Sequence, residues 1–201
     1  RELSIKCENN DLVLSVDNYV PASYNSYYDR AEQAVFADYV VVMAYDEHYN
    51  GSDEGSVASI GYVKKGIADT LKEVPAEQII LGIPFYTRVW ELTPVDESNP
   101  TEDEAANERG YTISSEAVGM SEVEARVAAN GVNLEWLEDC GQYYAEYQLD
   151  GKTYKIWIED QKSISEKLAI MTENHLAGAS FWKLGYEKNT IWDTITEIMN
   201  Q

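Results

Sequence analysis

Residues 39–49, with the sequence YVVVMAYDEHY, constrain the fold more than any other part of this chain. The run begins with consecutive β-branched side chains and passes abruptly into Tyr45, Asp46, Glu47 and His48. A continuous apolar run of this length is typical of a strand that is buried on both faces, as in a parallel sheet. In barrel enzymes, the residues at the carboxyl end of such a strand carry the chemistry. The pattern therefore predicts a parallel sheet with polar site residues at one edge.

Strand-like runs alternate with helix-like stretches through most of the chain. The expected strands are Leu12–Val16, the Tyr39 run, Gln78–Phe85 and Ala177–Trp182, and the expected helices are Arg1–Glu8, Tyr28–Phe36, Ser56–Leu71, Lys162–Asn174 and Thr190–Met199. In the helix expected at residues 28–36, Ala31, Ala34 and Val35 share one face. This alternation predicts an α/β fold of four βα units, which is half of an eight-unit (β/α)8 barrel.

The segment between Trp90 and Lys162 breaks the alternation. Its acidic stretch, residues 93–109, contains two prolines and is expected to be an extended loop without a helix. A short helix over 121–129 with Ser121 as its N-cap, a strand over 133–138, and a hairpin of 142–149 with 152–159 around Asp150-Gly151 are expected to follow. These elements predict a small α+β insertion and divide the chain into residues 1–90, 91–162 and 163–201.

The composition excludes several classes of partner. With 36 acidic and 15 basic residues, the chain has a formal charge of -21, which repels phosphate backbones and anionic membranes. We therefore expect neither nucleic acid nor a membrane as partner. Cys7 and Cys140 have no neighbouring Cys or His at ligand spacing, so free thiols, no metal site and no cofactor are expected. The chain has no initiating Met, and we interpret it as part of a longer protein.

Several motifs occur in an order that resembles a known family. LSVDNYVP, YVVVMAYDEHY, IILGIPFYTRVW and GASFWKLGYE, with the α+β segment before the last, resemble glycoside hydrolase family 18. Within that family, the chain is most similar to the bacterial spore-germination and cortex-lytic N-acetylglucosaminidases. The resemblance covers nearly the whole chain. It implies the C-terminal half of a (β/α)8 TIM barrel, strands 5 to 8, with the α+β insertion domain between strands 7 and 8.

The resemblance also implies an activity. Family members hydrolyse β-1,4-linked N-acetylhexosamine polymers, chitin or peptidoglycan, by substrate-assisted retention, in which the acetamido oxygen attacks its own anomeric carbon. A protonated Glu at the end of a DxxDxDxE motif gives a proton to the leaving oxygen. That motif is absent from these 201 residues. We therefore expect this chain by itself to be inactive, although its parent would be a glycosidase.

The resemblance assigns roles to named residues. Tyr45 and Asp46 match the catalytic pair, in which the tyrosine hydroxyl bonds the acetamido carbonyl and the carboxylate bonds the sugar. The residues expected to contact substrate are Met43 in the floor, Trp182 as a platform for the sugar ring, and Tyr86, Arg88, His48 and Asp17 at the border, with Tyr19 as a further wall residue. The implied partner is a glycan that contains N-acetylglucosamine.

Alternatives remain open for both the residues and the chain. Asp46 and Glu47 also fit a role in ending the strand and capping the next segment, and Trp182 fits a core position equally well. The chain as a whole also fits a lectin-like family member that binds glycan without cleaving it, or a structural α/β domain.

Location and assembly follow from the same interpretation. The resemblance implies a bacterial protein that is secreted and associated with the cell wall or the spore. Half a barrel leaves two strands, 12–16 and 177–182, with unpaired edges, and we expect a homodimer through these edges.

Overall fold

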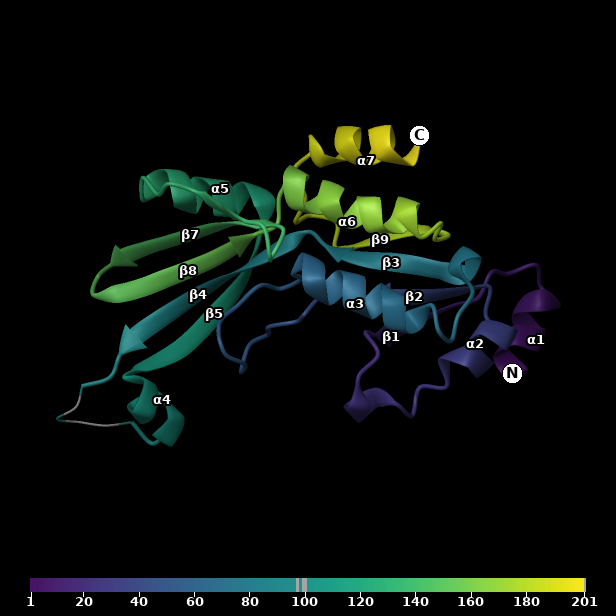
Figure 1. Cartoon of the computed structure of the whole chain (residues 1–201), viewed down its shortest axis with the longest axis horizontal. Helices are drawn as coiled ribbons and strands as arrows, with labels where there is room; N and C mark the ends of the chain where they lie inside the picture. Colours follow the sequence, from purple (N-terminus) through teal and green to yellow (C-terminus); the bar gives the residue numbers. More distant parts are fainter. Residues whose placement is uncertain (97, 99–100, 201) are drawn as a thin grey trace.

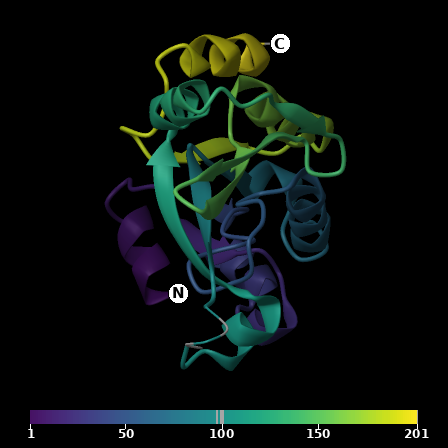
Figure 2. The same ribbon diagram turned by 90° about the vertical axis from the view of Figure 1, so that its left-hand side faces the viewer.

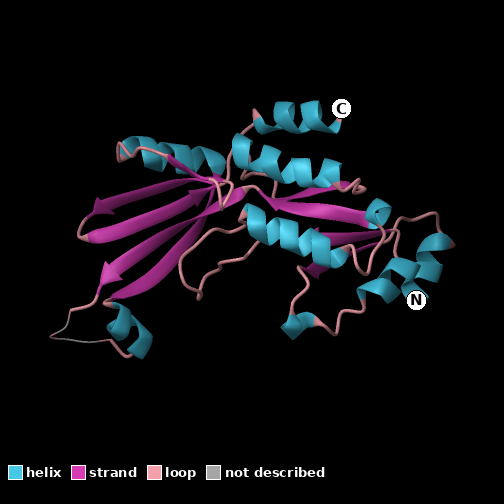
Figure 3. Cartoon of the chain, in the orientation of Figure 1, coloured by secondary structure: helices cyan, strands magenta, loops and turns pink. Residues whose placement is uncertain are grey.

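Two β-sheets lie end to end along the long axis of the molecule (Figure 1). The computed structural model describes residues 1–96, 98 and 101–200. One sheet has four parallel strands in the order β1-β2-β3-β9, and the other has five antiparallel strands in the order β5-β4-β8-β7-β6. Figure 3 shows helices beside both sheets, and Figure 2 shows α1 (Glu2–Glu8) and α3 (Ile60–Thr70) on opposite sides of the parallel sheet.

The parallel sheet is the scaffold of the site. Its strands are β1 (Ser15–Tyr19), β2 (Tyr39–Met43), β3 (Ile79–Pro84) and β9 (Gly178–Trp182). The side chains of Val40, Val42 and Leu81 are at most 1% exposed, because they face the helices of the main core. The β-branched composition of β2 thus gives the buried central strand that the sequence predicts.

Four helices follow the strands and bury this core. They are α2 (Arg30–Phe36), α3, α6 (Gln161–Glu173) and α7 (Ile191–Met199). The Ser59 side chain accepts a hydrogen bond from the Tyr62 N–H and starts α3, and Asp160 with Ser163 forms a capping box at the start of α6. The predicted helices are confirmed, with ends that differ by up to four residues.

Two predictions near the N-terminus are wrong. The apolar run at residues 12–14 is not a strand, and Leu12 and Val13 are 61% and 71% exposed. The strand begins at Ser15 because pairing with β2 places Ser15 opposite Tyr39. Val35 is 70% exposed, so it does not share the buried face of α2. Hydrophobicity alone misplaced residues 12–14, because β1 lies at the sheet edge and its register with β2 sets where it starts.

The antiparallel sheet begins earlier than the sequence suggests. Its strands are β4 (Tyr86–Pro94), β5 (Tyr111–Gly119), β6 (Glu135–Leu137), β7 (Gln142–Leu149) and β8 (Lys152–Ile158). Strand β4 follows β3 after a single residue, so the GIPFYTR motif divides between the two sheets. The predicted Asp150-Gly151 hairpin is confirmed, with positive φ angles of 51° and 74° at the turn. The division of the chain at residues 90 and 162 stays a prediction.

Three details of the insertion differ from expectation. The acidic stretch contains the helix α4 (Glu104–Arg109), because the Asp103 side chain caps it and Gly110 ends it in the left-handed conformation. Strand β5, the partner of β4, had no counterpart in the predicted elements. Helix α5 (Met120–Ala129) begins after Gly119 and not after Ser121. Gly119 is required there, because a Cβ would lie 2.9 Å from the Tyr186 carbonyl oxygen.

A fully buried polar network joins the insertion to α6 and to the loop after β2. The Lys167 ammonium of α6 lies 2.9 Å from the Glu159 carboxylate, and both side chains are 0% exposed. Glu159 also accepts hydrogen bonds from Gln142 at 2.7 Å and Ser163 at 2.8 Å, and Gln142 accepts one from Ser56. These residues come from β7, the end of β8, α6 and the loop after β2, so the network fixes the insertion against α6, a helix of the main core.

The described part of the chain offers little else of chemical note. No helix in it is long and apolar enough to cross a membrane, and no group of three or more His, Cys, Asp or Glu is placed to hold a metal ion. Cys7 and Cys140 are free thiols.

Candidate functional site

The carboxyl ends of the four parallel strands meet at one edge of their sheet. The parallel register places Tyr19 beside Met43, and Met43 beside Gly82. Since side chains alternate along a strand, Asp17, Tyr19, Met43 and Trp182 share the face opposite the main helical core. The residues expected from β1, β2 and β9 therefore lie on one surface.

Tyr45 and Asp46 stand just beyond β2 and are joined to the insertion by Tyr86. The hydroxyl of Tyr86, the first residue of β4, donates a hydrogen bond of 2.5 Å to the Asp46 carboxylate. The Tyr45 and Tyr86 rings meet edge to face, with centroids 6.3 Å apart. Asp46 has a φ of 57°, a left-handed conformation that turns the chain sharply after the strand. Strand ends from both sheets thus hold the predicted catalytic pair.

The tyrosines of the site are protonated at every physiological pH. Burial raises the pKa of Tyr45 to about 12, and the neighbouring Asp46, Asp17 and Tyr19 add to the effect. Burial also raises the pKa of Tyr62 to about 12. Burial and the hydrogen bond to Asp46 raise the pKa of Tyr86 as well. These phenols are therefore hydrogen-bond donors, which suits a neutral carbonyl oxygen as their acceptor.

A tyrosine-lined cavity of about 360 Å³ opens beside this pair. Tyr45 and Asp46 line it together with Tyr19, Tyr24, Tyr49 and Tyr62. The last three come from the loop after β1, the loop after β2, and the first turn of α3. Sequence reasoning missed them, although the local density of tyrosine after two strand ends was a usable signal. Their ring faces suit the C–H side of a pyranose.

Trp182 and Met43, the predicted platform and floor, lie at the carboxyl ends of β9 and β2. The Trp182 side chain is 55% exposed at the end of β9, so it is not a core residue. Met43 is half-buried on the same face of the sheet. Asp17 is exposed on the edge strand β1 and acts on Tyr45 through its charge. The assignment of these residues to a substrate stays a prediction.

Glu47 and His48 fix the loop that carries Asp46. The Glu47 carboxylate accepts hydrogen bonds from the N–H and hydroxyl of Ser59, at 2.8 Å and 3.1 Å, and so braces the start of α3. The His48 Nδ1 lies 2.8 Å from the Ser56 carbonyl oxygen, and its ring packs on Gly55, where any Cβ would lie 2.5 Å away. Glu47 therefore caps the next segment, as the alternative interpretation of Asp46 and Glu47 predicts. The structure places His48 in the loop framework, and its contact with substrate stays a prediction.

Arg88 lies on β4, two residues beyond Tyr86, on the same face of the antiparallel sheet. Its Nη1 donates a hydrogen bond of 3.1 Å to the Ser115 hydroxyl, and its guanidinium carbon lies 5.9 Å from the centre of the Trp90 ring. Trp90 in turn donates to the Gly55 carbonyl oxygen at 2.8 Å. Arg88 therefore contacts Trp90, which in turn bonds the loop after β2. The role of Arg88 at the border of the substrate site stays a prediction.

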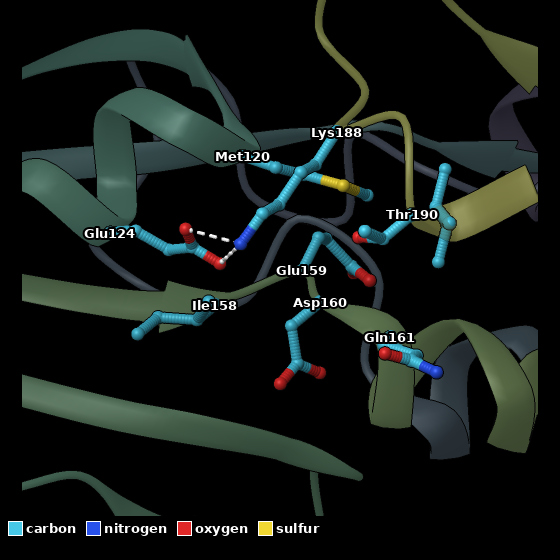
Figure 4. A pocket seen from close by; sticks show the side chains of 9 residues that line it. Met120, Glu124, Ile158, Glu159, Asp160, Gln161, Lys188 and Thr190 are labelled. Carbon is cyan, nitrogen blue, oxygen red and sulfur yellow. Dashed lines mark hydrogen bonds and ion pairs between the residues drawn. The ribbon is translucent and has the colours of Figure 1, made fainter.

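A second cavity, of about 190 Å³, lies between the insertion and the start of α7 (Figure 4). The Lys188 ammonium bridges to both oxygens of the Glu124 carboxylate at 2.8 Å across it. Asp160 is occupied in capping α6, and Glu159 in the buried network. The charged groups of this second cavity thus bind structural partners. The cavity does not include Tyr45 or Asp46 in its lining.

The arrangement around Asp46 can bind and orient a polar, uncharged group. It offers protonated phenols as donors, one carboxylate as acceptor, and aromatic faces on two sides. These are the features of a carbohydrate site, in which ring faces stack and a few polar groups fix orientation.

Comparison with known proteins identifies the family of the chain. The family described as Glycosyl hydrolases family 18 matches residues 1–187, and the chain belongs to that family. Among curated relatives, the chain is 28% identical over 170 residues to Uncharacterized glycosylase YvbX of Bacillus subtilis (strain 168), covering 84% of this chain and 44% of that protein. It is 26% identical over 173 residues to Cortical fragment-lytic enzyme of Bacillus anthracis, covering 85% and 36%.

The solved structures agree on the fold. The chitinase from Chromobacterium violaceum ATCC 12472 superposes with a TM-score of 0.82 at 21% identity, covering 100% of this chain and 59% of that one. The fold is that of family 18 chitinases, which is a TIM barrel, and the family resemblance read from the motifs is confirmed. The chain spans 44% and 36% of the lengths of the two curated relatives described above.

Proposed function

We propose that this chain forms the substrate-holding part of a glycosidase that hydrolyses β-1,4-linked N-acetylhexosamine polymers. The observation that carries the proposal is that Tyr45 and Asp46 line one cavity, where the Tyr86 hydroxyl bonds the Asp46 carboxylate and the Tyr86 ring meets the Tyr45 ring. In this proposal, β1, β2, β3 and β9 are strands 5 to 8 of the barrel, and the antiparallel sheet belongs to the insertion between the last two.

The proposed roles follow from substrate-assisted chemistry. The Tyr45 hydroxyl donates to the acetamido carbonyl oxygen and holds it against the anomeric carbon of its own sugar. As the glycosidic bond breaks, that oxygen bonds to the anomeric carbon, and the Tyr45 hydroxyl stabilises the oxazolinium-like intermediate while the Asp46 carboxylate accepts a hydrogen bond from the sugar. Water then opens the oxazolinium intermediate with retained configuration. Trp182 stacks on the sugar ring.

In this proposal, none of the 201 residues donates the proton to the leaving oxygen, because the DxxDxDxE motif is absent from them. Glu47, the acid nearest the pair in sequence, is engaged by Ser59. We therefore propose that the chain alone binds glycan without cleaving it. Clear release of reducing sugar from chitin oligomers or peptidoglycan by the 201-residue chain would contradict this.

Binding is the direct test of the site. We expect N-acetylglucosamine oligomers to bind the chain, and Tyr45→Phe to weaken that binding about tenfold, because a buried hydrogen bond is lost. Tyr27→Phe is the matched control, since Tyr27 is 74% exposed and does not line the cavity. Titration calorimetry measures both affinities. Equal binding by the two variants would overturn the assignment of Tyr45.

A lectin-like function is the second candidate. Two observations support it. Aromatic and polar side chains line the cavity, and the acid motif is absent from the sequence. The residue at the family's acid position in the full-length protein separates the two functions, because only Glu supports catalysis there. For either function we propose a bacterial cell-wall or spore location and a GlcNAc-containing glycan as partner, and the name Cortical fragment-lytic enzyme of the Bacillus anthracis relative supports the spore.

A further inference from the structure

The loop after β2 contains an asparagine followed by a glycine, Asn50-Gly51, directly after Tyr49, which lines the tyrosine-lined cavity. The sequence contains one other such pair, Asn130-Gly131, at the end of α5. Asparagine before glycine is a thermolabile pair in proteins, because glycine lets the next backbone nitrogen reach the asparagine carboxamide. The two pairs have the same sequence but differ in their hydrogen bonds.

The Asn50-Gly51 pair forms the tip of a tight turn. The Ser52 N–H donates to the Tyr49 carbonyl oxygen at 2.9 Å, and the Ser52 hydroxyl accepts a hydrogen bond from the Tyr49 N–H at 3.0 Å. Gly51 has a φ of 107°, which glycine adopts without strain. Both residues are exposed, and neither the Asn50 carboxamide nor the Gly51 N–H bonds another of the described residues. The two groups that would react with each other are therefore free.

The Asn130-Gly131 pair is held at both of these groups. The Asn130 Nδ2 donates to the Arg126 carbonyl oxygen at 2.8 Å, and the Gly131 N–H donates to the Ala128 carbonyl oxygen at 3.2 Å. A Cβ on the glycine of either pair would meet no atom of the described residues within 4 Å, so both glycines lie in open space. Hydrogen bonding at the reacting groups, and not crowding at the glycine, therefore distinguishes the two pairs.

We propose that Asn50 is a modification site, which converts spontaneously to aspartate and isoaspartate. The Gly51 nitrogen attacks the Asn50 Cγ, the Cγ–Nδ2 bond breaks, and ammonia leaves with the proton of that nitrogen. Water then opens the cyclic imide. Cleavage of its bond from the nitrogen to Cγ gives aspartate, and cleavage of its bond from the nitrogen to the Asn50 carbonyl carbon gives isoaspartate. The reaction consumes water and needs no oxidant, reductant or enzyme.

The modification changes both the charge and the backbone beside the cavity. Isoaspartate adds a methylene to the backbone between residues 50 and 51, and the tight turn that Ser52 closes cannot keep its geometry around a longer backbone. Tyr49, which lines the cavity, is then displaced. We expect the modified chain to bind N-acetylglucosamine oligomers about threefold more weakly, because a ring contact with the sugar is lost. This consequence rests on the proposed function, whereas the modification itself does not.

Peptide mass spectrometry measures the conversion of each asparagine while the purified 201-residue chain ages in mildly alkaline buffer. We expect Asn50 to convert at least about tenfold faster than Asn130 in the folded chain, because two hydrogen bonds must break before Asn130 reacts. In the chain unfolded by urea, the two asparagines should convert at similar rates, since each precedes a glycine. Asn50→Gln is the matched control, because its longer side chain disfavours the cyclic imide. Circular dichroism checks that this variant is folded.

Equal rates at Asn50 and Asn130 in the folded chain, or no conversion of Asn50 there, would overturn the modification site. Titration calorimetry with N-acetylglucosamine oligomers then compares the aged wild type with aged Asn50→Gln. A loss of affinity in the wild type alone supports the displacement of Tyr49, and equal affinities overturn that consequence while the modification site remains. If the wild type binds no oligomer before ageing, the proposed function is overturned, and the mass-spectrometric result still decides the modification site.

Discussion

Replacing Lys167 by Met tests the buried network that joins the insertion to α6. The substitution keeps the volume of the side chain and removes the ammonium that lies 2.9 Å from Glu159. Both side chains are 0% exposed, so the remaining carboxylate has no water to replace its partner. Breaking one side of a buried ion pair costs about 3–5 kcal/mol of unfolding free energy, which is a large share of the stability of a typical domain.

Urea unfolding followed by circular dichroism measures this loss of unfolding free energy. Two matched variants show whether the loss comes from the uncompensated buried charge. Removing both charges with Lys167→Met and Glu159→Gln is expected to cost at least about 2 kcal/mol less than the single change, because no uncompensated charge remains. Lys65→Met breaks a pair with Asp69 in which the lysine side chain is 70% exposed, and it is expected to cost less than about 1 kcal/mol.

The pH dependence of the loss provides an independent check. Burial raises the pKa of Glu159, and the neighbouring Lys167 ammonium partly offsets that rise. Loss of the ammonium in Lys167→Met is therefore expected to raise the pKa of Glu159 further. A group whose pKa is higher in the folded state contributes stability that is fully present at low pH and lost as pH rises. The deficit of Lys167→Met should therefore shrink as the pH falls toward 4.5, the ordinary pKa of Glu. A loss below about 1 kcal/mol that does not vary with pH would refute the reasoning.

Three further predictions follow from the site and the sheet. Tyr86→Phe removes the hydrogen bond to Asp46 and is expected to lower glycan affinity about threefold to tenfold in calorimetry, whereas unchanged affinity would show that Asp46 needs no such support. The pKa values of Tyr45 and Tyr62 are raised from 10.0 to about 12, so the stability that they contribute is complete below pH 10 and should be lost as pH rises toward 12. A melting temperature that stays constant over that range would contradict this assignment. Strands β1 and β9 form the edges of the parallel sheet, and we predict self-association through them, against which a strictly monomeric species in sedimentation would count.

Local sequence was sufficient wherever one short segment fixes its own conformation. The β2 strand follows from β-branched residues that are buried on the main core side. The hairpin at Asp150-Gly151 follows from two residues that accept positive φ angles. Capping pairs such as Asp160 with Ser163 mark where helices start. The motif order in these segments was enough to identify the family.

Pairing between distant segments decided the features that the sequence left open. The start of β1 depends on its register with β2, and β5 exists because β4 offers it a partner. Neither strand has the continuous apolar run that identifies a strand from sequence, because each lies at the edge of its sheet.

The sequence by itself determined the alternation of strands and helices and the family, and it predicts Tyr45 and Asp46 as the catalytic pair. Only the tertiary structure decided that Tyr86 holds Asp46 and that Tyr62 reaches the cavity from α3. The physical reason is that backbone preferences act within a few residues. Hydrogen bonds and charge pairs at a site join side chains that lie far apart in the chain, so their presence or absence appears only when the strands are packed.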